Sequence, residues 1–133
     1  MKKISILGST GSIGVNTLKL VRKFPDHFKV RGLVAGKNIG RLIKQIEYFS
    51  PDWVSVEEKS GMEKLHKRLS RRKIRLLWGQ DGATVIASAP EVDTVVAAIV
   101  GSAGLAPTLD AAKAVEIQVL TGIITSSPAS NPI

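Results

Sequence analysis

The chain has 133 residues, no cysteine and a formal net charge of +8, and 44% of its residues are hydrophobic. This composition favours one globular domain with a packed core, and the missing cysteines exclude disulfide bonds and thiolate metal sites. No apolar stretch approaches the roughly 20 residues of a membrane-spanning helix, and the apolar run near Met1 is too short for a secretory signal. These features predict a cytoplasmic protein with no membrane partner.

Much of the positive charge lies between Glu63 and Leu77, in the sequence EKLHKRLSRRKIRLL. Such a run is usually the solvated face of a helix, and Leu65 and Leu69 would form its buried apolar stripe. The alternative is a non-enzymatic module that uses this basic face to bind nucleic acid or an acidic partner. Few aromatic residues are interleaved for base stacking, so nucleic acid is not the expected partner.

Short apolar runs alternate with helical patterns along the chain. Strands are predicted for residues 3–7, 29–34, 53–56, 74–78 and 92–100. Helices are predicted for residues 13–24, 39–49, 58–72, 82–89 and 105–114. Pro25 and Pro90 each follow a predicted helix directly, as expected of a residue that cannot continue one. The segment VEIQVLTG, residues 115–122, is a candidate for one further strand.

The alternation of strands and helices indicates the fold class. It builds βαβ units, and runs such as ISIL and VVAAIV are apolar throughout, as in parallel strands buried on both faces. We therefore predict a Rossmann-type, doubly wound α/β fold with a mainly parallel sheet and helices on both faces. Residues 1–120 are expected to form this domain. Residues 121–133 are polar and interrupted by proline, so they are expected to form a divergent, flexible tail.

Three glycines, Gly8, Gly11 and Gly14, follow the first predicted strand and open the first predicted helix. In a doubly wound fold this turn faces the crevice where ligands bind, and the N-terminus of the helix favours a phosphate group. Gly8 would permit the tight turn, Gly11 the close approach of a pyrophosphate, and Gly14 the packing of the helix near the strand. The spacing and its context therefore predict a phosphate or dinucleotide site.

The expected pyrophosphate ligands are the backbone N–H groups of Thr10, Gly11, Ser12 and Ile13. The hydroxyl groups of Ser9, Thr10 and Ser12 would add further donors. The alternative is a glycine-rich turn without a ligand. No acidic residue stands in this segment to repel a phosphate, which favours the binding site.

The end of the second predicted strand indicates which dinucleotide is bound. An NAD site usually has an Asp or Glu here, which hydrogen-bonds the ribose 2′-hydroxyl. This chain continues instead with Ala35, Gly36, Lys37 and Asn38. Gly36 would give a ligand access to the backbone, and Lys37 offers a cation to a 2′-phosphate. The sequence therefore predicts a preference for NADPH over NADH of about tenfold or more, roughly 1.4 kcal/mol.

Four segments of the chain carry a family resemblance. They are ILGSTGSIG at residues 6–14, VAGKN at 34–38, FSP at 49–51 and AAIVGSAGLAPTL at 97–109. With these segments in order, residues 3–114 resemble 1-deoxy-D-xylulose 5-phosphate reductoisomerase. The resemblance implies an amino-terminal NADPH-binding domain, in which residues 10–13 hold the pyrophosphate and Gly36, Lys37 and Asn38 surround the adenosine 2′-phosphate. It also implies that AAIVG lies near the nicotinamide.

The resemblance further implies a reaction. Enzymes of this family rearrange 1-deoxy-D-xylulose 5-phosphate and reduce the resulting aldehyde with NADPH, giving 2-C-methyl-D-erythritol 4-phosphate in non-mevalonate isoprenoid biosynthesis. A divalent metal, Mg²⁺ or Mn²⁺, is chelated by oxygens of the substrate. The cofactor domain of another NADP-dependent reductase is an alternative, against which the segment AAIVGSAGL argues.

The chain departs from the family pattern after Ala114. Family members continue into a strand that ends Ala-Asn-Lys-Glu, whereas residues 121–124 here are Thr-Gly-Ile-Ile. The acidic metal-binding cluster and the catalytic and carboxy-terminal domains of the family are expected to be absent. We therefore expect no catalytic residue and no metal ligand in this chain, and no catalysis by the chain alone. A sugar phosphate would bind only if a catalytic domain were supplied, and a homo-oligomer is left open.

Overall fold

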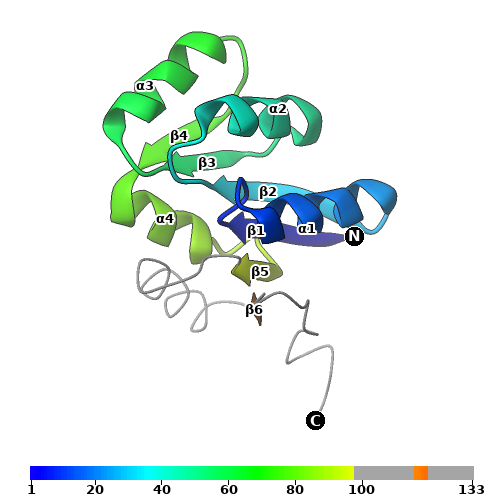
Figure 1. Cartoon of the computed structure of the whole chain (residues 1–133). Helices are drawn as coiled ribbons and strands as arrows, with labels where there is room; N and C mark the ends of the chain where they lie inside the picture. Colours follow the sequence, from blue (N-terminus) through cyan, green and yellow to red (C-terminus); the bar gives the residue numbers. More distant parts are fainter. Residues whose placement is uncertain (98–115, 120–133) are drawn as a thin grey trace.

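The computed structural model describes residues 1–97 and 116–119, which form a parallel sheet with helices packed against it (Figure 1). The strands are β1 (Lys2–Leu7), β2 (Phe28–Val34), β3 (Trp53–Val56), β4 (Arg75–Trp78), β5 (Thr94–Ala97) and β6 (Glu116–Val119). The helices are α1 (Ser12–Lys23), α2 (Ile39–Phe49), α3 (Lys59–Arg68) and α4 (Gly79–Ala87). Among these residues, no helix is long and apolar enough to cross a membrane.

The sheet has the strand order β4-β3-β2-β1-β5-β6, and every neighbouring pair is parallel. The chain winds outward from β1 to β4, and the segment containing α4 then leads back to β5 on the other side of β1 (Figure 1). The direction of winding therefore reverses between β1 and β5. In such sheets ligands bind outside the carboxyl ends of the strands at this switch point.

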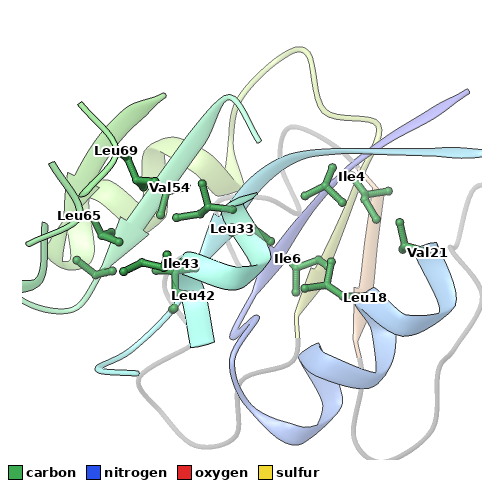
Figure 2. Close-up of a cluster of buried hydrophobic side chains, with 14 of the residues drawn as sticks. Ile4, Ile6, Leu18, Val21, Leu33, Leu42, Ile43, Val54, Leu65 and Leu69 are labelled. Carbon is green, nitrogen blue, oxygen red and sulfur yellow. The ribbon is translucent and has the colours of Figure 1, made fainter. Parts of the chain in front are cut away.

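Two hydrophobic clusters cover opposite faces of the sheet. Ile4 and Ile6 of β1 belong to the cluster that α1, α2 and α3 cover, where Leu18 contributes from α1 (Figure 2). Leu7 belongs to the other cluster, together with Ile86 of α4. Because successive side chains of a strand point to opposite faces, this division places α4 on the face opposite the first three helices. The predicted doubly wound α/β fold is confirmed.

The basic run of the sequence lies mainly on α3 and the turn after it. Leu65 is fully buried and Leu69 is 7% exposed, and both belong to the cluster beneath the helix. The charged residues between them, Lys67 and Arg68 among them, are exposed. The run therefore has the solvated face and apolar stripe that the sequence predicts.

Several element boundaries differ from the sequence-based ones by one to four residues. The predicted helix 58–72 ends at Arg68, because the Arg72 N–H donates to the Leu69 carbonyl in a turn that leads into β4. Helix α4 begins at Gly79, three residues before the predicted start, and Gly79 itself is left-handed with a φ of 73°. Of the predicted strand 92–100, residues 92–97 are described, and β5 begins only at Thr94. The predicted helix 105–114 and tail 121–133 lie outside the described residues.

Candidate functional site

The loop between β1 and α1 turns tightly at Gly8, whose φ of 88° lies in the left-handed region that glycine adopts without strain. The N–H groups of Gly8 and Ser9 both donate to the carbonyl of Val34, at 2.7 and 3.0 Å, so the loop is tied to the end of β2. A Cβ on Gly14 would collide with the Gly8 carbonyl oxygen and the Ser9 backbone. Gly8 and Gly14 therefore have the roles that the sequence predicts for them.

The N-terminal end of α1 presents unpaired donors at this loop. The helix begins at Ser12 after the N-cap residue Gly11, no side chain caps it, and its first turn holds no acidic residue. Within residues 1–97 and 116–119, the N–H groups of Thr10, Ser12 and Ile13 have no hydrogen-bond partner. Unpaired first-turn amides and the positive end of the helix dipole together favour an anion such as a phosphate.

Helix α2 holds the loop in place from its other side. The Gln45 side-chain amide donates to the Ser9 carbonyl at 2.8 Å in a buried hydrogen bond, and the Arg41 guanidinium donates to the Thr10 carbonyl at 3.0 Å. The C=O and N–H of a trans peptide point in opposite directions. Fixing the Ser9 carbonyl toward α2 therefore directs the Thr10 N–H away from α2. Neither Arg41 nor Gln45 is among the site residues that the sequence predicts.

Ser9 does not fit its predicted role as a hydroxyl donor to the ligand. Ser12 is exposed and Thr10 is partly exposed, whereas Ser9 is fully buried. The buried Ser9 Oγ has no hydrogen-bond partner in the described part of the chain. The prediction for this hydroxyl is wrong, because the backbone of Ser9 is anchored to both β2 and α2 and its side chain faces the interior.

The loop after β2 carries the other predicted ligands, Gly36, Lys37 and Asn38, and all three are exposed. A Cβ on Gly36 would meet no atom within 4 Å, so the space above this backbone is open. The Asn38 Oδ1 accepts a hydrogen bond from the Arg41 N–H at 3.1 Å and caps α2. Its side-chain amide N–H groups are left to donate elsewhere.

Lys37 has an acidic neighbour that its own loop does not supply. Its Nζ lies 3.7 Å from the Oε1 of Glu58, the N-cap residue of α3, and the two side chains are 73% and 59% exposed. The end of β2 lacks a carboxylate, as the sequence indicates, but the segment after the neighbouring strand β3 provides one.

The two predicted binding segments lie at the same edge of the sheet. Leu7 and Val34, the last residues of β1 and β2, are paired in register, so residues 10–13 and 36–38 both follow the carboxyl ends of adjacent strands. Arg41 connects them, since its backbone N–H binds Asn38 and its guanidinium binds Thr10. Of the segment AAIVG, only the first alanine, at the end of β5, is described.

The described residues offer little metal chemistry. No group of three or more His, Cys, Asp or Glu side chains that could hold a metal ion occurs among them. His27 and His66, the two histidines of the chain, are both exposed. The polar groups at this edge of the sheet are instead the amides at the start of α1 and the exposed side chain of Lys37.

The residue pattern that defines 1-deoxy-D-xylulose 5-phosphate reductoisomerase matches residues 4–121. The chain belongs to this family. The match reaches slightly beyond Ala114, where the sequence resemblance fades, and it favours a reductoisomerase over another NADP-dependent reductase. A reductoisomerase of Buchnera aphidicola subsp. Acyrthosiphon pisum (strain Tuc7) is 50% identical over 113 residues, covering 84% of this chain and 28% of that protein.

Solved structures of reductoisomerases resemble the chain as well. One in complex with NADPH, fosmidomycin and magnesium superposes with a TM-score of 0.84 at 34% identity, covering 92% of this chain and 30% of that one. The Zymomonas mobilis enzyme in complex with NADPH gives a TM-score of 0.83 at 28% identity, covering 89% of this chain and 31% of that one. The chain thus spans about 30% of the length of these relatives.

Proposed function

We propose that this chain binds NADPH at the carboxyl edge of its sheet and serves as the amino-terminal cofactor-binding part of a 1-deoxy-D-xylulose 5-phosphate reductoisomerase. One observation carries the proposal: the unpaired amides at the start of α1 lie at the same sheet edge as the exposed Lys37. Membership of the family and the NADPH named in two related structures support it.

The pyrophosphate is assigned to the segment Thr10, Gly11, Ser12 and Ile13. The amides of Thr10, Ser12 and Ile13 lack an acceptor among the described residues, whereas the Gly11 N–H donates to the Gly8 carbonyl at 3.3 Å. The loop carries no carboxylate that would compete with a phosphate. The hydrogen bonds from α2 and to β2 fix the loop before the ligand arrives, so little ordering cost remains for binding.

The adenosine 2′-phosphate is assigned to Gly36, Lys37 and Asn38. The open space over Gly36 admits a phosphate close to the backbone. Lys37 supplies a positive charge, and the Asn38 amide supplies N–H donors while its oxygen caps α2. A neutral 2′-hydroxyl gains nothing from the lysine charge, so this end of the site favours NADPH over NADH.

Bound NADPH supplies the hydride of the reduction. The residues of this chain bind and orient the cofactor through its phosphate groups. No ligand set for the divalent metal is present among the described residues, so we assign the chain no step that involves the metal. The rearrangement and reduction of 1-deoxy-D-xylulose 5-phosphate, the cytoplasmic location and the inactivity of these 133 residues alone are proposals that rest on the family resemblance.

The sharpest test is Ser12→Asp, read by NADPH fluorescence titration and by urea unfolding. A carboxylate in the first turn of α1 repels a phosphate but interacts favourably with the helix dipole, by about 0.3–1 kcal/mol. We expect the variant to be at least as stable as the wild type and to lose NADPH binding. Asn16→Asp, an exposed change in the next turn, should leave binding close to wild type. A stable Ser12→Asp variant that binds NADPH normally would overturn the pyrophosphate assignment.

A further inference from the structure

A pocket beside the loop after β2 extends the site toward α3. Its volume is about 150 Å³, and it is lined by Gly36, Lys37, Ile39, Glu58, Ser60, Gly61 and Lys64. Four of these residues belong to α3 or to its N-cap, a segment in which the sequence indicates no ligand contact. The pocket therefore brings a second element to the place proposed for the 2′-phosphate.

The sheet explains why these segments meet. Strands β2 and β3 are parallel neighbours, with Val34 paired to Ser55, and the Glu57 N–H donates to the Gly36 carbonyl at 3.4 Å just beyond the strand ends. Gly61 is buried against Ile39, so the first turns of α2 and α3 lie close together. The pocket lies between these two helix starts.

The charged residues around the pocket would allow a phosphate group to replace the Glu58 carboxylate as the partner of Lys37. Lys37 and Lys64 carry positive charge, Ser60 carries a hydroxyl, and Glu58 is paired with Lys37. Lys64 has no carboxylate within ion-pair distance among the described residues, and it stands one helical turn after Ser60, so both share a face of α3. An exposed pair such as Lys37–Glu58 contributes at most about 1 kcal/mol, so a dianion competes with it readily.

We propose that this pocket receives the adenosine 2′-phosphate of NADPH, with Lys64 and Ser60 of α3 as ligands beside Lys37, and with Glu58 as an internal competitor for Lys37. The inference rests on the proposed NADPH function and extends it to a second helix. Binding of the 2′-phosphate replaces the Glu58 carboxylate at Lys37 and brings Lys64 an anionic partner. The released Glu58 returns to solvent.

Glu58 also tunes the choice between the two cofactors. Its carboxylate repels a 2′-phosphate, whereas it is an acceptor of the kind that holds the ribose 2′-hydroxyl in NAD sites. The pocket is thus lined by one carboxylate, Glu58, which could accept a hydrogen bond from a ribose 2′-hydroxyl. It is also lined by two cations, Lys37 and Lys64, which would attract a 2′-phosphate. Neutralising Glu58 should therefore raise the ratio of NADPH affinity to NADH affinity, and neutralising Lys64 should lower it.

The test uses Lys64→Gln, Glu58→Gln and the matched control Lys67→Gln, each titrated with NADPH and with NADH by fluorescence. Lys67 is exposed on the same helix but does not line the pocket. We expect Lys64→Gln to weaken NADPH binding about fivefold and Glu58→Gln to tighten it about threefold, the size of effects at exposed charges. NADH should bind Lys64→Gln as it binds the wild type, and the control should change neither affinity.

Each outcome separates this inference from the proposed function. Normal NADPH binding by the wild type, with no change in either pocket variant, overturns the role of α3 and leaves the proposed function standing. An equal loss of NADPH and NADH in Lys64→Gln also overturns it, because a phosphate ligand must discriminate between the two. Absence of binding of both cofactors by the folded wild type overturns the proposed function and this inference together.

Discussion

The two loops at the carboxyl edge of the sheet are built in different ways. The loop after β1 is anchored by backbone hydrogen bonds to Val34, by the buried Gln45 bond and by Arg41, and its donors are main-chain amides. The loop after β2 presents Lys37, a largely exposed side chain whose partner Glu58 is also exposed. The conformation of the first loop is therefore fixed by hydrogen bonds to β2 and α2. The second loop offers its ligand exposed charged side chains, which can be substituted without disturbing the fold.

Because of this difference, we expect the two loops to control different properties: the binding of any dinucleotide, and the discrimination between NADPH and NADH. Changes at the first loop should alter the stability of the fold and the binding of any dinucleotide, since the pyrophosphate is common to NADPH and NADH. Changes at the second loop should alter only the discrimination between the two cofactors. Each of the following variants is expected to affect one loop without the other.

The largest effect is expected for Gly14→Ala. The added methyl group would overlap the Gly8 carbonyl and the Ser9 backbone, so α1 must move away from the loop. Overpacking at such a contact costs about 3 kcal/mol, and binding of both cofactors should fall sharply. Urea unfolding measures the loss.

Gly40→Ala is the matched control, because a Cβ at this exposed position of α2 would meet nothing within 4 Å. It should raise stability by about 0.5–1 kcal/mol through helix propensity. Equal stability of the Gly14→Ala variant and the wild type would contradict the close contact between α1 and the loop.

A smaller effect is expected for Gln45→Leu. The change leaves the buried Ser9 carbonyl unpaired, which costs about 1–2 kcal/mol of stability, partly offset by removal of the unpaired Gln45 Oε1. The loosened loop should bind NADPH and NADH less tightly by the same factor. Paired titrations measure this, with the exposed neighbour Lys44→Gln as control. If Gln45→Leu weakened the binding of NADPH but not of NADH, Gln45 would act on the 2′-phosphate end of the site. The two loops would then not have the separate effects described above.

Lys37→Gln should affect discrimination alone. We expect NADPH to bind about tenfold more weakly, which corresponds to roughly 1.4 kcal/mol, while NADH binding stays unchanged. The free energy of unfolding should change by less than about 0.5 kcal/mol, because the pair with Glu58 is exposed. Titration with both cofactors and urea unfolding check the two statements, and unchanged NADPH affinity would remove Lys37 from the site.

Most of the fold, and the tight geometry of the glycine loop after β1, could be predicted from the sequence. Apolar runs predict buried parallel strands, and β1, β2, β3 and β5 lie where these runs stand, whereas the edge strand β4 has no buried residue. The glycines at positions 8 and 14 predict a tight turn and a close contact, because no other residue satisfies those geometries. Helix ends were less predictable, since the end of α3 depends on how the chain turns to pair β4 with β3.

Side-chain partners between loops were harder to predict. Gln45 stands on the buried side of α2 beside Leu42 and Ile46, and a polar residue at such a position signals a hydrogen-bonded partner without naming it. The sequence around Glu58 does not indicate that this residue contacts Lys37. Its role depends on the adjacency of β2 and β3, which the local pattern around Lys37 does not contain.

The most direct measurement is a titration of the wild-type protein with NADPH and with NADH under identical conditions. The account predicts that NADPH binds, and that it binds about tenfold or more tightly than NADH, roughly 1.4 kcal/mol. Equal affinities for the two cofactors, or no binding of NADPH by the folded protein, would contradict it.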